Sequence, residues 1–197
     1  MIIGICGASG SGKTTKCTEI KNRLFTKNIV IISLDSFYSG VPDGVDPKTY
    51  NFDSPDAFNI DQCIDVIKNL KNGKSVSVPQ YDFITHKPKE EKTYIEKVDI
   101  VLFEGIFGFY WQELRDLMDL RIYIETASDI CLMRRTLRDV RERGRTLESI
   151  YQQYEKFVRP AYLKYIKDAS EYAHIIIPNN TYSDVALHCI CERLRNV

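Results

Sequence analysis

The sequence contains no apolar run long enough to cross a membrane. Its longest unbroken apolar stretches are Ile29–Ile32, Ile100–Phe103 and Ile175–Ile177, far below the roughly 20 residues that a membrane span needs. An excess of charge is also missing, because 27 Lys and Arg residues balance 27 Asp and Glu residues. Neither nucleic acid nor a membrane surface is therefore indicated as a partner.

Several other signals are missing as well. None of the six cysteines belongs to a C-x-x-C pair, which favours reduced thiols in a core over a zinc site or a disulfide framework. The first apolar stretch begins at Ile2, so we expect no signal peptide and a cytoplasmic location. Repeats, low-complexity tracts and Pro-, Gly- or Ser-rich linkers are lacking, and 197 residues suit a single domain spanning 1–197.

The most informative segment present is a phosphate-binding loop. It has the spacing G-x-x-x-x-G-K-[ST] and consists of Gly7, Ala8, Ser9, Gly10, Ser11, Gly12, Lys13 and Thr14. The glycines let successive backbone N–H groups ring a phosphate, Lys13 supplies a positive charge to the outer phosphates, and Thr14 can bind Mg²⁺. A glycine-rich turn between a strand and a helix is the alternative interpretation.

Apolar β-branched runs alternate with helical patterns along the chain. Strands are expected at Ile2–Cys6, Ile29–Leu34, Val98–Phe103, Leu120–Glu125 and Ala173–Ile177. Helices are expected at Thr14–Phe25, Ile60–Lys71, Glu113–Met118, Asp129–Glu142, Leu147–Ala169 and Asp184–Arg195. This alternation predicts an α/β fold, a P-loop three-layer α/β/α sandwich with a five-stranded parallel sheet and a ligand site at the carboxyl ends of the strands.

One segment interrupts the alternation, at about residues 75–97. Ser75–Phe83 is typical of a strand, and Lys92–Glu96 could return antiparallel to it, with His86–Lys92 as the polar connection. We predict a β-hairpin that protrudes from the sheet.

Two acids follow expected strands. Glu104 stands at the carboxyl end of its strand, where phosphate-loop proteins place a carboxylate near Mg²⁺; an exposed strand-end acid is the alternative. Asp35 follows the second strand and, if that strand lies beside the first, faces the terminal phosphate. Asp35 could then act as the base for an acceptor hydroxyl, hold a magnesium-bound water, or be a plain loop acid.

An aromatic stretch with interspersed acids follows Asp35. It includes Phe37-Tyr38, Tyr50–Asp53 and Phe58, and Tyr81, Phe83 and His86 come later on the expected hairpin. Rings of this kind could stack on a flat heteroaromatic ligand, and Asp53 could accept hydrogen bonds from two vicinal ribose hydroxyls. The alternative is that the aromatic residues pack the core.

Residues 134–145 contain six arginines and two acids. On a helix, Arg134, Arg138 and Arg141 would share one face, and Gly144 can end the helix and act as a hinge. We interpret about 134–146 as an Arg-rich helical lid over phosphates. A solvated helix face and a nucleic-acid patch are the alternatives.

Taken in order, several segments resemble uridine–cytidine kinases over nearly the whole chain. These segments are Gly7–Thr15, Asp35–Tyr38, Phe52–Phe58, Pro79–Phe83, Leu102–Ile106, Arg134–Asp139 and Glu142–Arg145. The resemblance implies transfer of the γ-phosphate of ATP or GTP, with Mg²⁺, to the 5′-hydroxyl of uridine or cytidine. It also implies a small-molecule partner and a homo-oligomer, commonly a tetramer.

The resemblance assigns roles to individual residues. Asp35 serves as the base, with Lys13 and Arg138 as further catalytic groups, and Thr14, Glu104 and Asp35 surround the metal. Arg143 and Thr15 join the loop at the donor phosphates. Asp53 and Arg135 hold the ribose, and Tyr81 and His86 read the pyrimidine edge. The remaining substrate residues that it implies are Phe52, Phe83, Ile106, Arg145 and Gln153.

Two other functions stay open at this point. One is a kinase for another ribosyl compound or a small alcohol, and the other is a nucleotide-dependent switch protein. A GTP switch would be expected to carry an N-K-x-D motif, and the sequence contains none.

Overall fold

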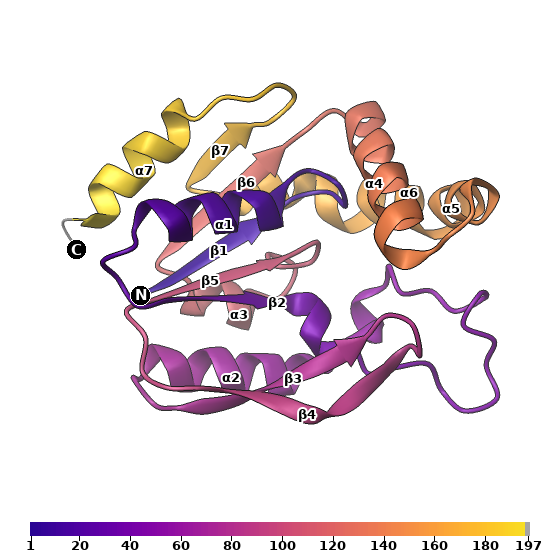
Figure 1. Ribbon diagram of the computed structural model, residues 1–197, viewed down its shortest axis with the longest axis horizontal. Coiled ribbons are helices and arrows are strands. Elements are labelled where there is room, and N and C mark those ends of the chain that lie inside the picture. The colour runs from indigo at the N-terminus through magenta and orange to yellow at the C-terminus, as the bar shows by residue number, and fades with distance from the viewer. Residues whose placement is uncertain (196–197) are drawn as a thin grey trace.

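The computed structural model describes residues 1–195. Its centre is a five-stranded parallel sheet with the strand order β2-β5-β1-β6-β7 (Figure 1). The strands are β1 (Ile2–Cys6), β2 (Ile29–Ser33), β5 (Ile100–Gly105), β6 (Leu120–Glu125) and β7 (Ile175–Pro178). The five predicted strands are thus confirmed, with bounds that differ by at most two residues.

Helices cover both faces of the sheet. Ile3 and Ile5 of β1 pack in one apolar cluster with α1 (Lys13–Arg23) and α7 (Val185–Arg195). Ile2 and Cys6 point the other way, into a cluster that includes residues of α2 (Ile60–Lys71) and α3 (Gln112–Leu117). Successive side chains of a strand face opposite sides, so both faces are buried, and the predicted three-layer sandwich is confirmed.

The order of the strands corrects one expectation. The strand that precedes Asp35, β2, does not lie beside β1, because β5 pairs with both and separates them. The apolar β5 is buried along its whole length, as a strand inside a parallel sheet must be. Asp35 and the loop after β1 are therefore held at the same sheet edge by strands that are not neighbours.

The hairpin is a separate two-stranded sheet made of β3 (Val76–Asp82) and β4 (Lys87–Ile95). Figure 1 shows it beside α2, and Val76 and Val78 of β3 are buried there in the core. The predicted polar connection His86–Lys92 is wrong, since β4 already begins at Lys87. All of β4 before Ile95 is exposed, so its side chains show no alternation, and only pairing with β3 makes it a strand.

A helical layer lies beyond the carboxyl ends of the strands. It contains α4 (Ser128–Arg143) and α5 (Leu147–Gln153), which Figure 1 shows on the side toward which the strands point. The single helix expected over 147–169 is instead a series of short pieces: π-helical η3 (Tyr154–Val158), α6 (Arg159–Ala161), π-helical η4 (Tyr162–Ile166) and the 3₁₀ segment η5 (Lys167–Tyr172).

Pro160 accounts for this break. It has no N–H to donate inside a helix, and next to it the Arg159 N–H bonds the Tyr154 carbonyl five residues back instead of four. This shift is the hydrogen-bond pattern of a π-helix.

No helix among residues 1–195 is both long enough and apolar enough to cross a bilayer. The cysteines are free thiols, and Cys189 is exposed while the others are buried.

Candidate active site

A cleft with a volume of about 840 Å³ lies at the carboxyl edge of the sheet. The predicted side chains that line it are Ser9, Lys13, Thr14, Asp35, Phe52, Asp53, Tyr81, Phe83, His86, Glu104, Ile106, Arg135, Arg138, Arg143, Arg145 and Gln153. Tyr38 and Tyr50 of the aromatic stretch line it as well, and so do Gly105 and Phe157, which were not assigned to the site from the sequence. Phe157 belongs to the π-helical η3, close to Pro160.

The phosphate-binding loop connects β1 to α1. Gly10 and Gly12 have left-handed backbones, with φ angles of 83° and 99°. A Cβ on Gly10 would lie 2.3 Å from the Cys131 carbonyl oxygen, and one on Gly12 would lie 2.5 Å from the amide nitrogen of Asn179. Both conformation and space therefore require glycine, and the sharp turn delivers the start of α1 to the cleft.

The two side chains that end the motif have different partners. Lys13 donates from Nζ to the Ala8 carbonyl at 3.0 Å, so its charge lies over the loop. Thr14 donates from Oγ1 to Oε1 of Glu104 at 3.0 Å. Thr15 is exposed on the first turn of α1 and is not among the residues that line the cleft.

Glu104 is 6% exposed, so the interpretation of an exposed strand-end acid is wrong. Burial raises the pKa of its carboxyl; Lys13 opposes this effect and Asp35 adds to it. A hydroxyl and a carboxylate within hydrogen-bond distance are hard oxygen donors that suit Mg²⁺. No group of three or more His, Cys, Asp or Glu within residues 1–195 could hold a metal, so phosphate and water oxygens would complete the coordination.

Asp35 belongs to the 3₁₀ turn η1 (Leu34–Phe37), directly after β2. Ser33 caps this turn, since its Oγ accepts the Asp35 N–H at 3.2 Å. The turn places Asp35 in the same cleft as Lys13 and Thr14.

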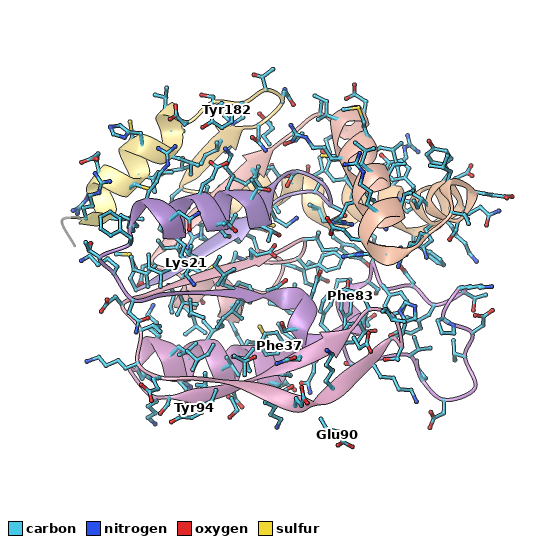
Figure 2. All side chains as sticks on the ribbon, in the orientation of Figure 1. Lys21, Phe37, Phe83, Glu90, Tyr94 and Tyr182 are labelled. Carbon is cyan, nitrogen blue, oxygen red and sulfur yellow. The ribbon has the colours of Figure 1, made fainter. Side chains whose placement is uncertain are left out.

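Aromatic rings form the far wall of the cleft. Phe52 stacks on His86 with 5.0 Å between ring centroids, and Phe83 meets Tyr81 edge-on at 5.3 Å. Figure 2 shows Phe83 pointing from the hairpin toward the helical layer, where the Arg143 guanidinium lies 4.6 Å from its ring centroid. Simple core packing is the better description for Phe37, which is fully buried.

Two polar groups of this wall are poised for a ligand. The Tyr81 hydroxyl is buried and has no hydrogen-bond partner among the described residues, and burial raises its pKa to about 12. Burial, together with Arg145, lowers the pKa of His86, so its ring is neutral at pH 7. Each neutral group can donate or accept one hydrogen bond.

Asp53 lies between the aromatic wall and the arginines. Burial raises the pKa of its carboxyl, while the nearby Arg135 and Arg145 lower it. An acid desolvated in this way requires partners when ionised, and vicinal hydroxyls of a sugar would supply them.

The lid arginines converge on one acid that was not selected from the sequence, Asp139, which is completely buried. Its Oδ1 lies 2.8 Å from a terminal nitrogen of Arg138 and 3.6 Å from one of Arg143. Its Oδ2 lies 3.6 Å from Arg135 Nε and 3.5 Å from an Arg145 nitrogen. Burial alone would raise the pKa of Asp139, but these arginines together hold it below its usual value.

The predicted arginine face is therefore wrong in part. Arg138 reaches the cleft, but Arg134 points elsewhere and donates to the carbonyls of Asn179 and Asn180, and Arg141 is exposed. Arg143 and Arg145 flank Gly144, which ends α4 in the left-handed conformation with a φ of 61°. Helical spacing places Arg143, four residues after Asp139, beside that acid, whereas the reversal of the chain at Gly144 turns Arg145 back to it.

A phosphate loop, a lysine and a hydroxyl–carboxylate pair at the carboxyl edge of a parallel sheet define a P-loop nucleotide-binding protein. The chain belongs to the phosphoribulokinase/uridine kinase family, whose model matches residues 2–186. Members of this family are kinases, so the chain uses a nucleotide phosphate donor and a small-molecule acceptor.

Relatives and solved structures agree with this family. The chain is 45% identical over 195 residues to uridine-cytidine kinase B of Dictyostelium discoideum, covering 98% of this chain and 80% of that protein. It is 43% identical to uridine-cytidine kinase A of the same organism, covering 99% of this chain but 39% of that protein. The chain therefore spans well under half the length of the second relative.

Phosphoribulokinase from Rhodobacter spheroides shares the fold, with a TM-score of 0.68, 17% identity, and coverage of 90% of this chain and 69% of that one. D-glycerate 3-kinase from Cryptococcus neoformans has a TM-score of 0.65 at 16% identity, covering 86% of this chain and 80% of that one.

Proposed function

We propose that this protein transfers the γ-phosphate of ATP or GTP, with Mg²⁺, to the 5′-hydroxyl of uridine and cytidine. The observation that carries the proposal is that one cleft joins the donor elements Lys13 and Thr14 to an aromatic wall that ends in Asp53. The names of the relatives support the same chemistry, since they are uridine-cytidine kinases.

In this proposal the donor phosphates bind along the loop. Lys13 leaves the Ala8 carbonyl for the outer phosphates, while Thr14 and Glu104 hold Mg²⁺, which neutralises phosphate charge when bound. Arg138 and Arg143 approach the transferred group from the lid and exclude water.

The acceptor binds against the aromatic wall. Phe52 and Phe83 enclose the base, and Tyr81 and His86 bond its polar edge. Asp53, with Arg135, Arg145 and Gln153 nearby, holds the ribose hydroxyls. Asp35 accepts the proton of the 5′-hydroxyl as the hydroxyl oxygen attacks the γ-phosphate of the donor. This step depends mainly on alignment. A homo-oligomer, a tetramer by resemblance, and a cytoplasmic location are parts of the same proposal.

The test is a panel of acceptors with the product mass measured. Uridine and cytidine should each gain one phosphoryl group, while 5′-deoxyuridine, which lacks the acceptor hydroxyl, should gain none. Adenosine, nicotinamide riboside and small alcohols complete the panel. Product formed only with another ribosyl compound or an alcohol would replace the proposed acceptor, and nucleotide hydrolysis that ignores every acceptor would favour a switch protein.

A further inference from the structure

Two side chains outside the cleft meet on one backbone oxygen of the phosphate loop. Thr126 donates from Oγ1 to the Ser11 carbonyl at 3.0 Å, and Asn179 donates from Nδ2 to the same oxygen at 2.7 Å. All three residues are buried, with exposed fractions of 8% for Thr126, 8% for Asn179 and 0% for Ser11. A carbonyl has two lone pairs, so the pair of donors satisfies it fully.

The two donors come from the ends of adjacent strands. Thr126 follows β6 and Asn179 follows β7, and the Asn179 N–H bonds the Glu125 carbonyl at 2.7 Å. Arg134 stabilises the segment after β7 by donating from one terminal nitrogen to the Asn179 backbone carbonyl at 3.0 Å. The backbone of Asn179 is therefore held by the sheet and by α4, and this fixes the position of its side-chain amide.

The peptide between Ser11 and Gly12 transmits this arrangement to the phosphates. In a trans peptide the C=O and the N–H point in opposite directions. Donors that fix the Ser11 oxygen on the outer side therefore aim the Gly12 N–H toward the inner, concave side of the loop. Gly12 has no Cβ, which leaves room for the Asn179 amide nitrogen.

We infer that Thr126 and Asn179 are positioning residues that clamp the phosphate loop in its anion-binding shape before the donor arrives. Neither is among the residues that line the cleft, and they act through the Ser11–Gly12 peptide. The inference rests on the donor half of the proposed function, and is independent of which acceptor is phosphorylated.

Calorimetric titration of the protein with MgATP and with MgADP tests this role without turnover. Thr126→Val is close to isosteric and removes one donor, and Asn179→Leu removes the other without adding charge. Each should weaken nucleotide binding by about three- to tenfold, because a buried hydrogen bond to the loop is lost. Thr126→Ser keeps the hydroxyl and should restore native affinity.

Matched controls separate positioning from general damage. Thr49→Val removes an exposed hydroxyl that donates to the Asp46 carbonyl at 2.9 Å, and Asn69→Leu removes a side-chain amide on α2 that donates to the Asp65 carbonyl. Both should leave nucleotide affinity unchanged. In turnover assays the clamp variants should raise the KM for the donor and leave the KM for the acceptor within about twofold of native.

The double variant gives the sharpest result. With one donor left the Ser11 oxygen stays bonded, but with both removed it loses both bonds, so the loss should exceed the product of the two single effects. Thr126→Val with donor affinity within twofold of native overturns the clamp, even if the other variants fail to fold. Failure of the native protein to bind nucleotide would instead overturn the proposed function.

Discussion

The acid at the centre of the lid offers a test in which stability and activity should respond differently. Asp139 is completely buried, and four guanidinium groups lie within 3.6 Å of its carboxylate. Asp139→Asn keeps the shape of the side chain and removes the charge that offsets the arginines. The cleft then carries four positive charges with no counter-ion at their centre.

The size of the effect follows from burial. Removing one partner of a buried ion pair costs about 3–5 kcal/mol. The arginine side chains are 7% to 32% exposed, and an asparagine oxygen can still accept from Arg138, so the lower end, about 3 kcal/mol, applies. For a chain of this size each kcal/mol shifts Tm by about 2–4 °C, which predicts a Tm lower by about 6–12 °C in a protein that still folds.

Nucleotide binding should respond differently. Donor phosphates supply the negative charge that the variant lacks, so MgATP should raise its Tm by more than it raises that of the native protein. Its kcat should fall by about 10- to 100-fold, because the arginines lose the orientation that alignment requires.

Thermal unfolding with and without MgATP, together with initial rates, measures these effects. Asp129→Asn is the control, since Asp129 is exposed on the first turn of the same helix and should cost less than about 1 kcal/mol. An Asp139→Asn variant that unfolds within 2 °C of the native protein, or that MgATP stabilises less than the native protein, would contradict this expectation.

Three further changes test the remaining assignments. Asp35→Asn should bind nucleotide normally but lose about 10²–10⁴ in kcat; a rate near native in steady-state assays would exclude Asp35 as the base. Asp53→Ala should raise the acceptor KM far more than the donor KM and narrow the preference for ribosides over 2′-deoxyribosides; an unchanged preference would remove Asp53 from the ribose site. Glu104→Gln should raise the Tm of the ligand-free protein at pH 7. It should also weaken Mg²⁺ binding, so that activity requires a higher Mg²⁺ concentration. Burial raises the pKa of Glu104 in the folded state above its unfolded value of 4.5. Protonated Glu104 therefore stabilises the fold fully below pH 4.5, and this stabilisation is lost as the pH rises through the folded-state pKa. A lower Tm in a scan at pH 7 would contradict this sign.

Much of the site could be predicted because its signals are local. The segment from Gly7 to Thr14 has the complete spacing of a phosphate-binding loop. The β-branched runs mark the buried strands. Asp35 and Glu104 were identified because each follows a strand, and parallel strands end at the same edge of a sheet. The helix at Ile60–Lys71 was predicted with its correct bounds, because it has an Asn59 cap and a clear apolar face.

Other features could not be read in this way. Strand β4 is exposed before Ile95, and the pairing that makes it a strand is with β3. The π-helical segments arise because backbone N–H groups near Pro160 bond to carbonyls five residues back. The apolar pattern of the sequence there is that of an ordinary helix.

The identity of the phosphate loop and the alternation of strands and helices were already determined by residues close together in the chain, since turn geometry and side-chain periodicity are local properties. Three of the four arginines around Asp139 lie one or four residues from it on α4, so local helical spacing brings them there. The strand order and the two donors on the Ser11 carbonyl, by contrast, were decided only by the tertiary structure. These contacts join residues as far apart as Ser11 and Asn179, and no local spacing specifies which distant groups packing brings together.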